Sequence, residues 1–117
     1  MSKRILLVDD DPDHELLLEI AALDSGGRVV GRVGDVASLG DAVARTRPDV
    51  IVLDVWLSDG VALDRLDEVR AAVGELPILL WTHDPWVVRR YPEAVDLPII
   101  DKLAPRSELL AQLAATA

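Results

Sequence analysis

The sequence contains no cysteine and no phenylalanine, and aromatic residues make up only 3% of it. The absence of cysteine excludes disulfides, thiolate zinc sites and a cysteine nucleophile. No apolar run approaches the roughly 20 residues that a membrane-spanning helix requires. Basic residues are also scarce, with 12 Lys and Arg against 21 Asp and Glu, so the net charge is −9. An acidic surface repels phosphate backbones, so we expect neither membrane insertion nor direct nucleic-acid binding by this chain.

Apolar residues, in contrast, are plentiful, since half of the 117 residues are hydrophobic. This content favours a folded chain, and the length suits one domain with one core, so we expect a single domain over residues 1–117. Only four apolar residues follow the basic N-terminus, which is too few for a secretion signal. We therefore expect a cytoplasmic location.

Short apolar runs alternate with segments of helical spacing along the chain. Runs of this kind, bounded by polar residues, are typical of strands buried on both faces, and they lie at 4–8, 28–33, 50–53, 78–81 and 97–100. Helices are predicted at 12–24, 37–46, 61–73 and 105–115, while prolines leave room for only a short helix at 86–91. Asp11 and Pro12 supply an N-cap and a first helical position for the first helix. Alternation of this kind predicts an α/β fold with a doubly wound, five-stranded parallel sheet.

Polar side chains follow four of the five predicted strands. Asp9 and Asp10 follow the first, and three further residues follow the third, fourth and fifth, namely Asp54, Thr82 and Lys102. The carboxyl ends of parallel strands meet at one edge of the sheet, where ligands of open α/β sheets bind. Each residue alone is a weak signal, but together they predict a site.

The expected site combines three carboxylates, a hydroxyl and an ammonium. Two carboxylates about 4 Å apart repel by about 4 kcal/mol at an effective dielectric constant of 20, so the cluster either raises the pKa of one carboxyl group or binds a cation. Oxygen ligands of this type suit Mg²⁺, which would keep Asp54 ionised and nucleophilic. A carboxylate nucleophile, a metal, Lys102 and Thr82 are the parts that phosphoryl transfer needs.

Four segments carry a resemblance to a known family: RILLVDDDP, RPDVIVLDVWLSDG, LPILLWTHD and IIDKLAPRSELL. With them the chain resembles the receiver domain of two-component response regulators. The resemblance implies a flavodoxin-like (βα)5 fold with strand order 2-1-3-4-5. It implies that Asp54 is the phosphoacceptor, that Lys102 pairs with it, and that Thr82 binds the phosphoryl group. For Mg²⁺, it implies direct ligation by Asp10, Asp54 and the backbone carbonyl of Trp56, with Asp9 acting partly through water.

The same resemblance implies the role and partners of the chain. The phosphoryl donor would be a histidine kinase or a histidine phosphotransfer protein, and an unidentified protein would be the downstream target. The chain would be a phosphorylation switch or relay, alone or as part of a larger regulator. It would not be an enzyme, although it would catalyse its own phosphorylation and dephosphorylation. Formation of a homodimer is compatible with the sequence.

Two other functions stay open. Members of the family usually carry proline after the lysine and an aromatic residue three positions before it, where this chain has Leu103 and Ile99. These departures motivate a pseudo-receiver that is not phosphorylated and only binds protein. The second alternative is a small Mg²⁺-dependent aspartyl phosphatase with an Asp-x-Asp motif at Asp9 and Asp11.

Two residues near the predicted site have open roles. Trp56 stands two positions after Asp54, and we hypothesise that its indole covers the phosphoryl group and slows attack by water. The alternative is a partly exposed loop aromatic. His14 lies in the first turn of the first predicted helix, where we expect it to face solvent with only a weak interaction with the acidic residues.

Overall fold

A five-stranded parallel sheet forms the centre of the computed structural model, which describes residues 3–116. Its strands are β1 (Arg4–Val8), β2 (Arg28–Val33), β3 (Val50–Leu53), β6 (Ile78–Thr82) and β7 (Ile99–Asp101). They lie in the order β2-β1-β3-β6-β7, all parallel. This is the predicted 2-1-3-4-5 order once the extra hairpin, β4 (Trp56–Leu57) with β5 (Gly60–Val61), is set aside. The predicted fold class is therefore confirmed.

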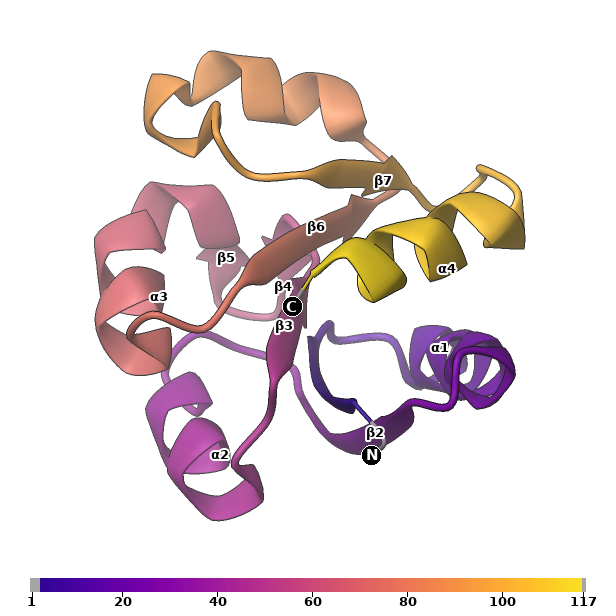
Figure 1. The fold of residues 1–117 in the computed structure, drawn as a ribbon. Coiled ribbons are helices and arrows are strands. Elements are labelled where there is room, and N and C mark those ends of the chain that lie inside the picture. Colours follow the sequence, from indigo (N-terminus) through magenta and orange to yellow (C-terminus); the bar gives the residue numbers. More distant parts are fainter. Residues whose placement is uncertain (1–2, 117) are drawn as a thin grey trace.

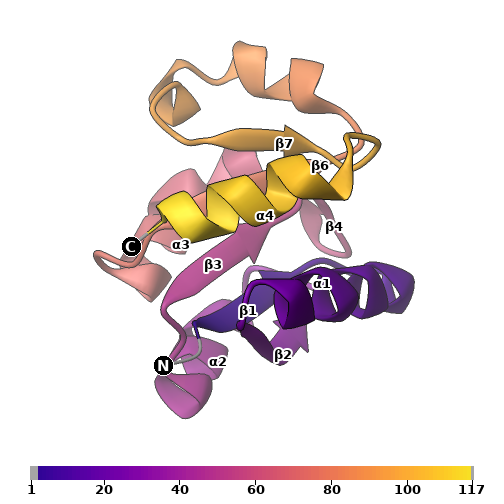
Figure 2. The ribbon, with the colours of Figure 1, turned by 45° about the vertical axis from the view of Figure 1, so that its right-hand side comes forward.

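Helices cover both faces of the sheet (Figures 1 and 2). One face carries α1 (Pro12–Asp24) and α4 (Arg106–Ala115), and the other carries α2 (Leu39–Thr46) and α3 (Leu66–Val73). Successive strand residues point to opposite faces, so Ile5 and Leu7 pack with α1 and α4 while Leu6 and Val8 pack with α2 and α3. Two cores result, and the strands between them are buried on both sides.

The first helix begins as the sequence predicts, and only one narrow face of it is buried. Asp11 is the N-cap, and its side chain accepts a hydrogen bond from the backbone N–H of Asp13. Most of the larger apolar residues of the helix are exposed, namely Leu16, Leu17, Ile20 and Leu23. The buried face is made by Leu18, Ala21 and Ala22. The helix is apolar over most of its circumference, so spacing alone does not identify the packed side, and alanines allow a close approach to the sheet.

The segment between Asp54 and α3 differs from the single helix that the spacing predicts over 61–73. The chain first forms the β4–β5 hairpin, then a 3₁₀ helix over Ala62–Arg65, and only then α3. Gly60, at the end of the tight turn, has φ of +121°, a value that glycine adopts without strain. The side chain of Asp59 accepts a hydrogen bond from the backbone N–H of Val36 and pairs with Arg65. These contacts hold the loop that follows the predicted phosphoacceptor.

The fourth connection contains no α-helix among the described residues. Two 3₁₀ helices, Pro85–Arg90 and Pro92–Ala94, replace the short helix predicted at 86–91. Each begins with a proline, which suits a first helical position but interrupts a longer helix. β7 begins two residues later than predicted. No helix in the described part of the chain has the length and apolar character to cross a membrane.

Candidate phosphoacceptor site

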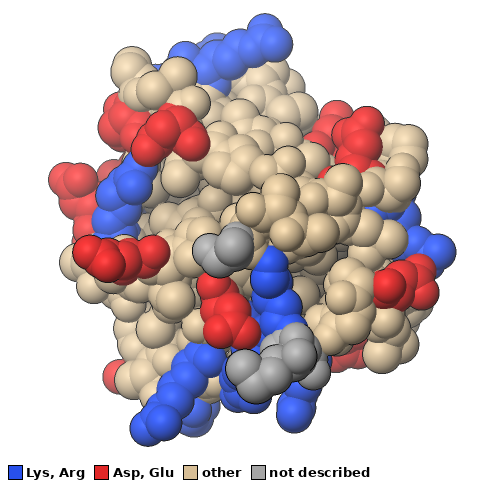
Figure 3. All heavy atoms as spheres, in the orientation of Figure 1, with Lys and Arg blue, Asp and Glu red and all other residues tan. Residues whose placement is uncertain are grey.

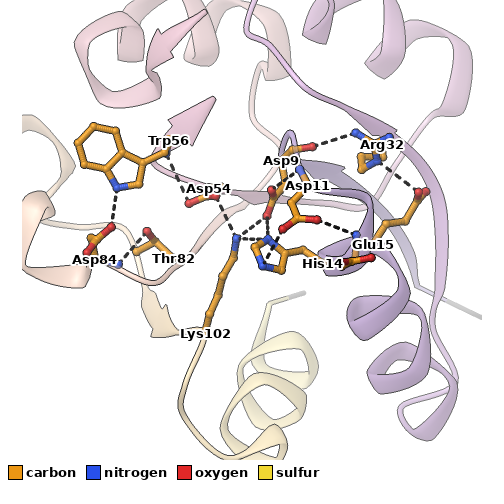
Figure 4. Close-up of polar contacts among 11 residues, drawn as sticks. Asp9, Asp11, His14, Glu15, Arg32, Asp54, Trp56, Thr82, Asp84 and Lys102 are labelled. Atoms are coloured by element: carbon orange, nitrogen blue, oxygen red, sulfur yellow. Dashed lines mark hydrogen bonds and ion pairs between the residues drawn. The ribbon is translucent and has the colours of Figure 1, made fainter. Parts of the chain in front are cut away.

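Four of the predicted polar residues lie where the parallel strands end, and three of them, Asp9, Asp54 and Lys102, are in contact there (Figure 4). Asp9 follows β1, Asp54 follows β3, Thr82 ends β6 and Lys102 follows β7. Asp9 and Thr82 are fully buried, and Asp54 is 6% exposed. Because all five strands are parallel, these strand ends lie at the same edge of the sheet, although the residues are up to 93 positions apart.

Lys102 joins the two buried carboxylates. Its Nζ lies 2.5 Å from Oδ2 of Asp9 and 3.0 Å from Oδ2 of Asp54. The side chain of Lys102 is only 2% exposed, so little water separates the three charges. A buried ion pair of this kind is costly to break, because removal of one partner leaves an uncompensated charge.

The backbone around Asp54 directs further polar groups toward its carboxylate. The N–H of Trp56 lies 3.5 Å from Oδ1 of Asp54. The N–H of Ala62 donates to the carbonyl of Val55, which makes these two residues a hydrogen-bonded pair of the hairpin. Hydrogen-bonded and non-hydrogen-bonded pairs alternate along antiparallel strands, so the next pair, Trp56 and Val61, shares no backbone hydrogen bonds. In such a pair the N–H and C=O of Trp56 both point away from β5, on the side of Asp54. The use of the Trp56 carbonyl as a metal ligand stays a prediction.

The remaining predicted residues occupy different positions. Asp10 is exposed, and it lies outside the group of closely spaced ligand atoms that Asp9, His14 and Asp54 form. The hydroxyl oxygen of Thr82 accepts a hydrogen bond from the backbone N–H of Asp84 at 3.2 Å. Asp84 in turn accepts from the indole N–H of Trp56 at 2.7 Å. Trp56 is 44% exposed and is thus held by Asp84 at the rim of the site.

His14 does not face solvent as the sequence led us to expect. Its Nδ1 lies 3.0 Å from Oδ2 of Asp9 and 2.7 Å from Nζ of Lys102, and its side chain is 15% exposed. The first turn of α1 follows Asp9 so closely that the imidazole folds back over the end of β1. The acidic residues before the helix could have indicated that His14 approaches the site, because a histidine three residues after Asp11 lies near its carboxylate.

Several known proteins are similar in sequence to this chain, although no family model matches it. The probable transcriptional regulatory protein TcrX of Mycobacterium tuberculosis is 40% identical over 78 residues, which are 67% of this chain and 33% of that protein. A protein-glutamate methylesterase/protein-glutamine glutaminase of Rhizobium etli is 30% identical over 66% of this chain and 22% of that protein. The chain thus spans about a third or less of these two relatives.

A solved structure covers nearly the whole chain. The receiver domain of the sensor histidine kinase PA1611 from Pseudomonas aeruginosa is 25% identical, with a TM-score of 0.80 over 99% of this chain and 98% of that one. That structure holds a magnesium ion in its active-site cleft. The chain belongs to the receiver domains of response regulators.

Charged side chains of both signs lie on the surface of this receiver. On the face drawn in Figure 3, several basic side chains gather at the bottom of the view, and acidic groups lie at both sides. Arg65 pairs with both Asp59 and Glu68. Burial raises the pKa of Asp59, but hydrogen bonds from the Val36 backbone and from Arg65 outweigh it and lower the pKa below its usual value of 3.8.

Proposed function

We propose that this receiver accepts a phosphoryl group on Asp54 from the phosphohistidine of a histidine kinase or a histidine phosphotransfer protein. The observation that carries the proposal is the buried ion pair between Asp54 and Lys102, beside Asp9, at the edge of the sheet. An Asp54 oxygen forms a bond to phosphorus while the P–N bond of the donor breaks. The leaving imidazole nitrogen takes up a proton. The phosphoaspartate would make the chain a switch or relay for an unidentified downstream protein.

Lys102 and Thr82 have distinct tasks in this reaction. The Lys102 ammonium, already bound to Asp54, neutralises charge on the phosphoryl oxygens as the group arrives. The Thr82 oxygen accepts from the Asp84 backbone, which leaves its hydrogen to be donated to a phosphoryl oxygen. Both residues act on an acyl phosphate attached to the chain itself. The chain would accordingly catalyse its own phosphorylation and dephosphorylation, without being an enzyme for a separate substrate.

The donor set fits Mg²⁺. Carboxylates of Asp9, Asp10 and Asp54, with the carbonyl of Trp56, offer only oxygen, which Mg²⁺ prefers. When bound, the ion would neutralise charge on the carboxylates and on the incoming phosphoryl oxygens. Nζ of Lys102 occupies the point where Asp9, Asp54 and His14 converge, so we assign the ion to the side of Asp10 and Trp56.

Intact mass spectrometry tests the proposed acceptor. Incubation of the chain with Mg²⁺ and acetyl phosphate should add the mass of one phosphoryl group, and EDTA or Asp54→Asn should prevent the addition. Asp96→Asn is a matched control, because Asp96 is an exposed carboxylate away from the strand ends. A phosphoryl group located on Asp9 would favour the aspartyl phosphatase. A folded chain without any adduct from acetyl phosphate or a phosphohistidine donor would leave the pseudo-receiver as the explanation.

A further inference from the structure

The backbone on both sides of Lys102 is anchored by hydrogen bonds. The N–H of Lys102 donates to the carbonyl of Thr82 at 2.9 Å, and the N–H of Leu103 donates to Oδ1 of Asp101 at 2.8 Å. Ala104 donates to the carbonyl of Asp101 at 2.9 Å. These bonds fix the backbone position of Lys102. They do not fix the position of its ammonium, because four rotatable bonds separate Cα from Nζ.

An alternative position for the side chain is available beside the site. A groove of about 200 Å³ borders Lys102 and is lined by Leu17, Trp81 and Leu109 among others. The two carboxylates attract the ammonium, but Coulomb attraction has little directional preference. Further contacts are therefore needed to hold Nζ against Asp54 in one orientation.

His14 supplies a directional contact. Its Nδ1 lies 2.7 Å from Nζ of Lys102, an ammonium that can only donate, and 3.0 Å from Oδ2 of Asp9, whereas its Nε2 lies 3.5 Å from Oδ2 of Asp11. The closer ammonium contact places the ring hydrogen on Nε2. Nδ1 then carries the lone pair, and it accepts a hydrogen bond from Nζ of Lys102 at 2.7 Å. The imidazole is itself fixed, since it lies edge-on to the ring of Trp81 with centroids 6.0 Å apart.

Trp81 supplies a second contact to the ammonium of Lys102. Nζ of Lys102 lies 5.2 Å from the centroid of the Trp81 ring, within the range of a cation–π interaction. Trp81 is 5% exposed and belongs to the core between β6, α1 and α4. The indole is thus a rigid surface that limits where the ammonium can move.

We propose that His14 and Trp81 are positioning residues that hold the Lys102 ammonium against Asp54. The inference rests on the proposed function only for its effect on phosphoryl transfer, because the position of Lys102 is measurable without a phosphoryl donor. Leu103 does not restrict φ as proline would, so the orientation of the Lys102 side chain depends on its contacts with side chains of α1 and β6.

NMR spectroscopy of the unphosphorylated chain tests the placement directly. The Lys102 ammonium, 2% exposed, should give a slowly exchanging signal, and the ring nitrogens of His14 should show hydrogen on Nε2. His14→Ala should remove the Lys102 signal through exchange with water, and His14→Asn, which restores an acceptor oxygen, should return it. His83→Ala is the matched control, because His83 is an exposed imidazole next to His14 with centroids 5.2 Å apart. Hydrogen on Nδ1 of His14, or an unchanged Lys102 signal in His14→Ala, would overturn the proposal.

Phosphorylation kinetics test the consequence. With acetyl phosphate and Mg²⁺, His14→Ala should lower the maximal rate about tenfold, the effect of one hydrogen bond to a charged group. The half-saturating donor concentration should stay unchanged, and His14→Asn should recover most of the rate. Trp81→Leu should lower the rate more than Trp81→Phe, which keeps a ring face. Equal maximal rates in the wild type and His14→Ala would refute the positioning role. If the wild type takes up no phosphoryl group while the NMR signals behave as expected, the proposed function fails and the placement of Lys102 stands.

Discussion

Replacement of Lys102 by methionine should destabilise the folded chain, because it leaves two buried carboxylates without their cation. Oxygens of Asp9 and Asp54 lie within 4.8 Å of each other, which corresponds to a repulsion of at least about 3.5 kcal/mol at an effective dielectric constant of 20. Removing one member of a buried pair typically costs about 3–5 kcal/mol, so the two estimates agree. We expect Lys102→Met to lower the free energy of unfolding by about 3 kcal/mol.

Urea unfolding in EDTA, followed by circular dichroism, measures this loss. Arg89→Met is the control, because it removes the same charge from an exposed position and should change stability by less than about 0.5 kcal/mol. Combining Lys102→Met with Asp54→Asn removes the repulsion and should recover most of the loss. A loss below about 1 kcal/mol, or no recovery in the double variant, would show that Asp9 and Asp54 do not repel as their distance requires.

Three further changes test other parts of the structure. Asp11→Ala removes the N-cap of α1 and should lower the free energy of unfolding by about 1 kcal/mol, measured by urea unfolding. The pKa of Asp59 is lower in the folded chain, so the ionised carboxylate stabilises the fold above about pH 4, and this contribution is lost as the pH falls through the folded pKa. Below pH 3.8, the free energy of unfolding should therefore depend less on pH in Asp59→Asn than in the wild type. Urea unfolding at several pH values measures this difference. Asp84→Ala releases the indole N–H groups of Trp56 and Trp86, so tryptophan emission should shift to longer wavelength, and the lifetime of the phosphorylated chain should shorten if Trp56 shields it from water.

Each of these three predictions has a specific contrary outcome. Unchanged stability in Asp11→Ala would mean that the Asp13 N–H finds an equivalent partner in water. Identical acid profiles for the wild type and Asp59→Asn would show that Val36 and Arg65 do not favour the ionised carboxylate. An unchanged lifetime of the phosphorylated Asp84→Ala variant would support the alternative that Trp56 is an ordinary loop aromatic.

The sequence alone determined the architecture and most of the site, because both depend on local patterns. Short apolar runs between helical segments identified β1, β3 and β6, and the position of Asp54 directly after a buried run placed it at the edge of the sheet. Asp9, Thr82 and Lys102 followed from the same rule, since parallel strands with crossovers of one hand bring their carboxyl ends together.

Only the tertiary structure decided which side chains contact one another. The face of α1 that packs on the sheet, Leu18 with Ala21, could not be chosen from spacing, because leucines surround the helix. The same limit applied to His14, whose approach to Lys102 depends on how α1 leaves the end of β1. Hydrophobic periodicity reports the direction of a side chain relative to its own element, whereas contacts across 88 positions depend on how whole elements pack.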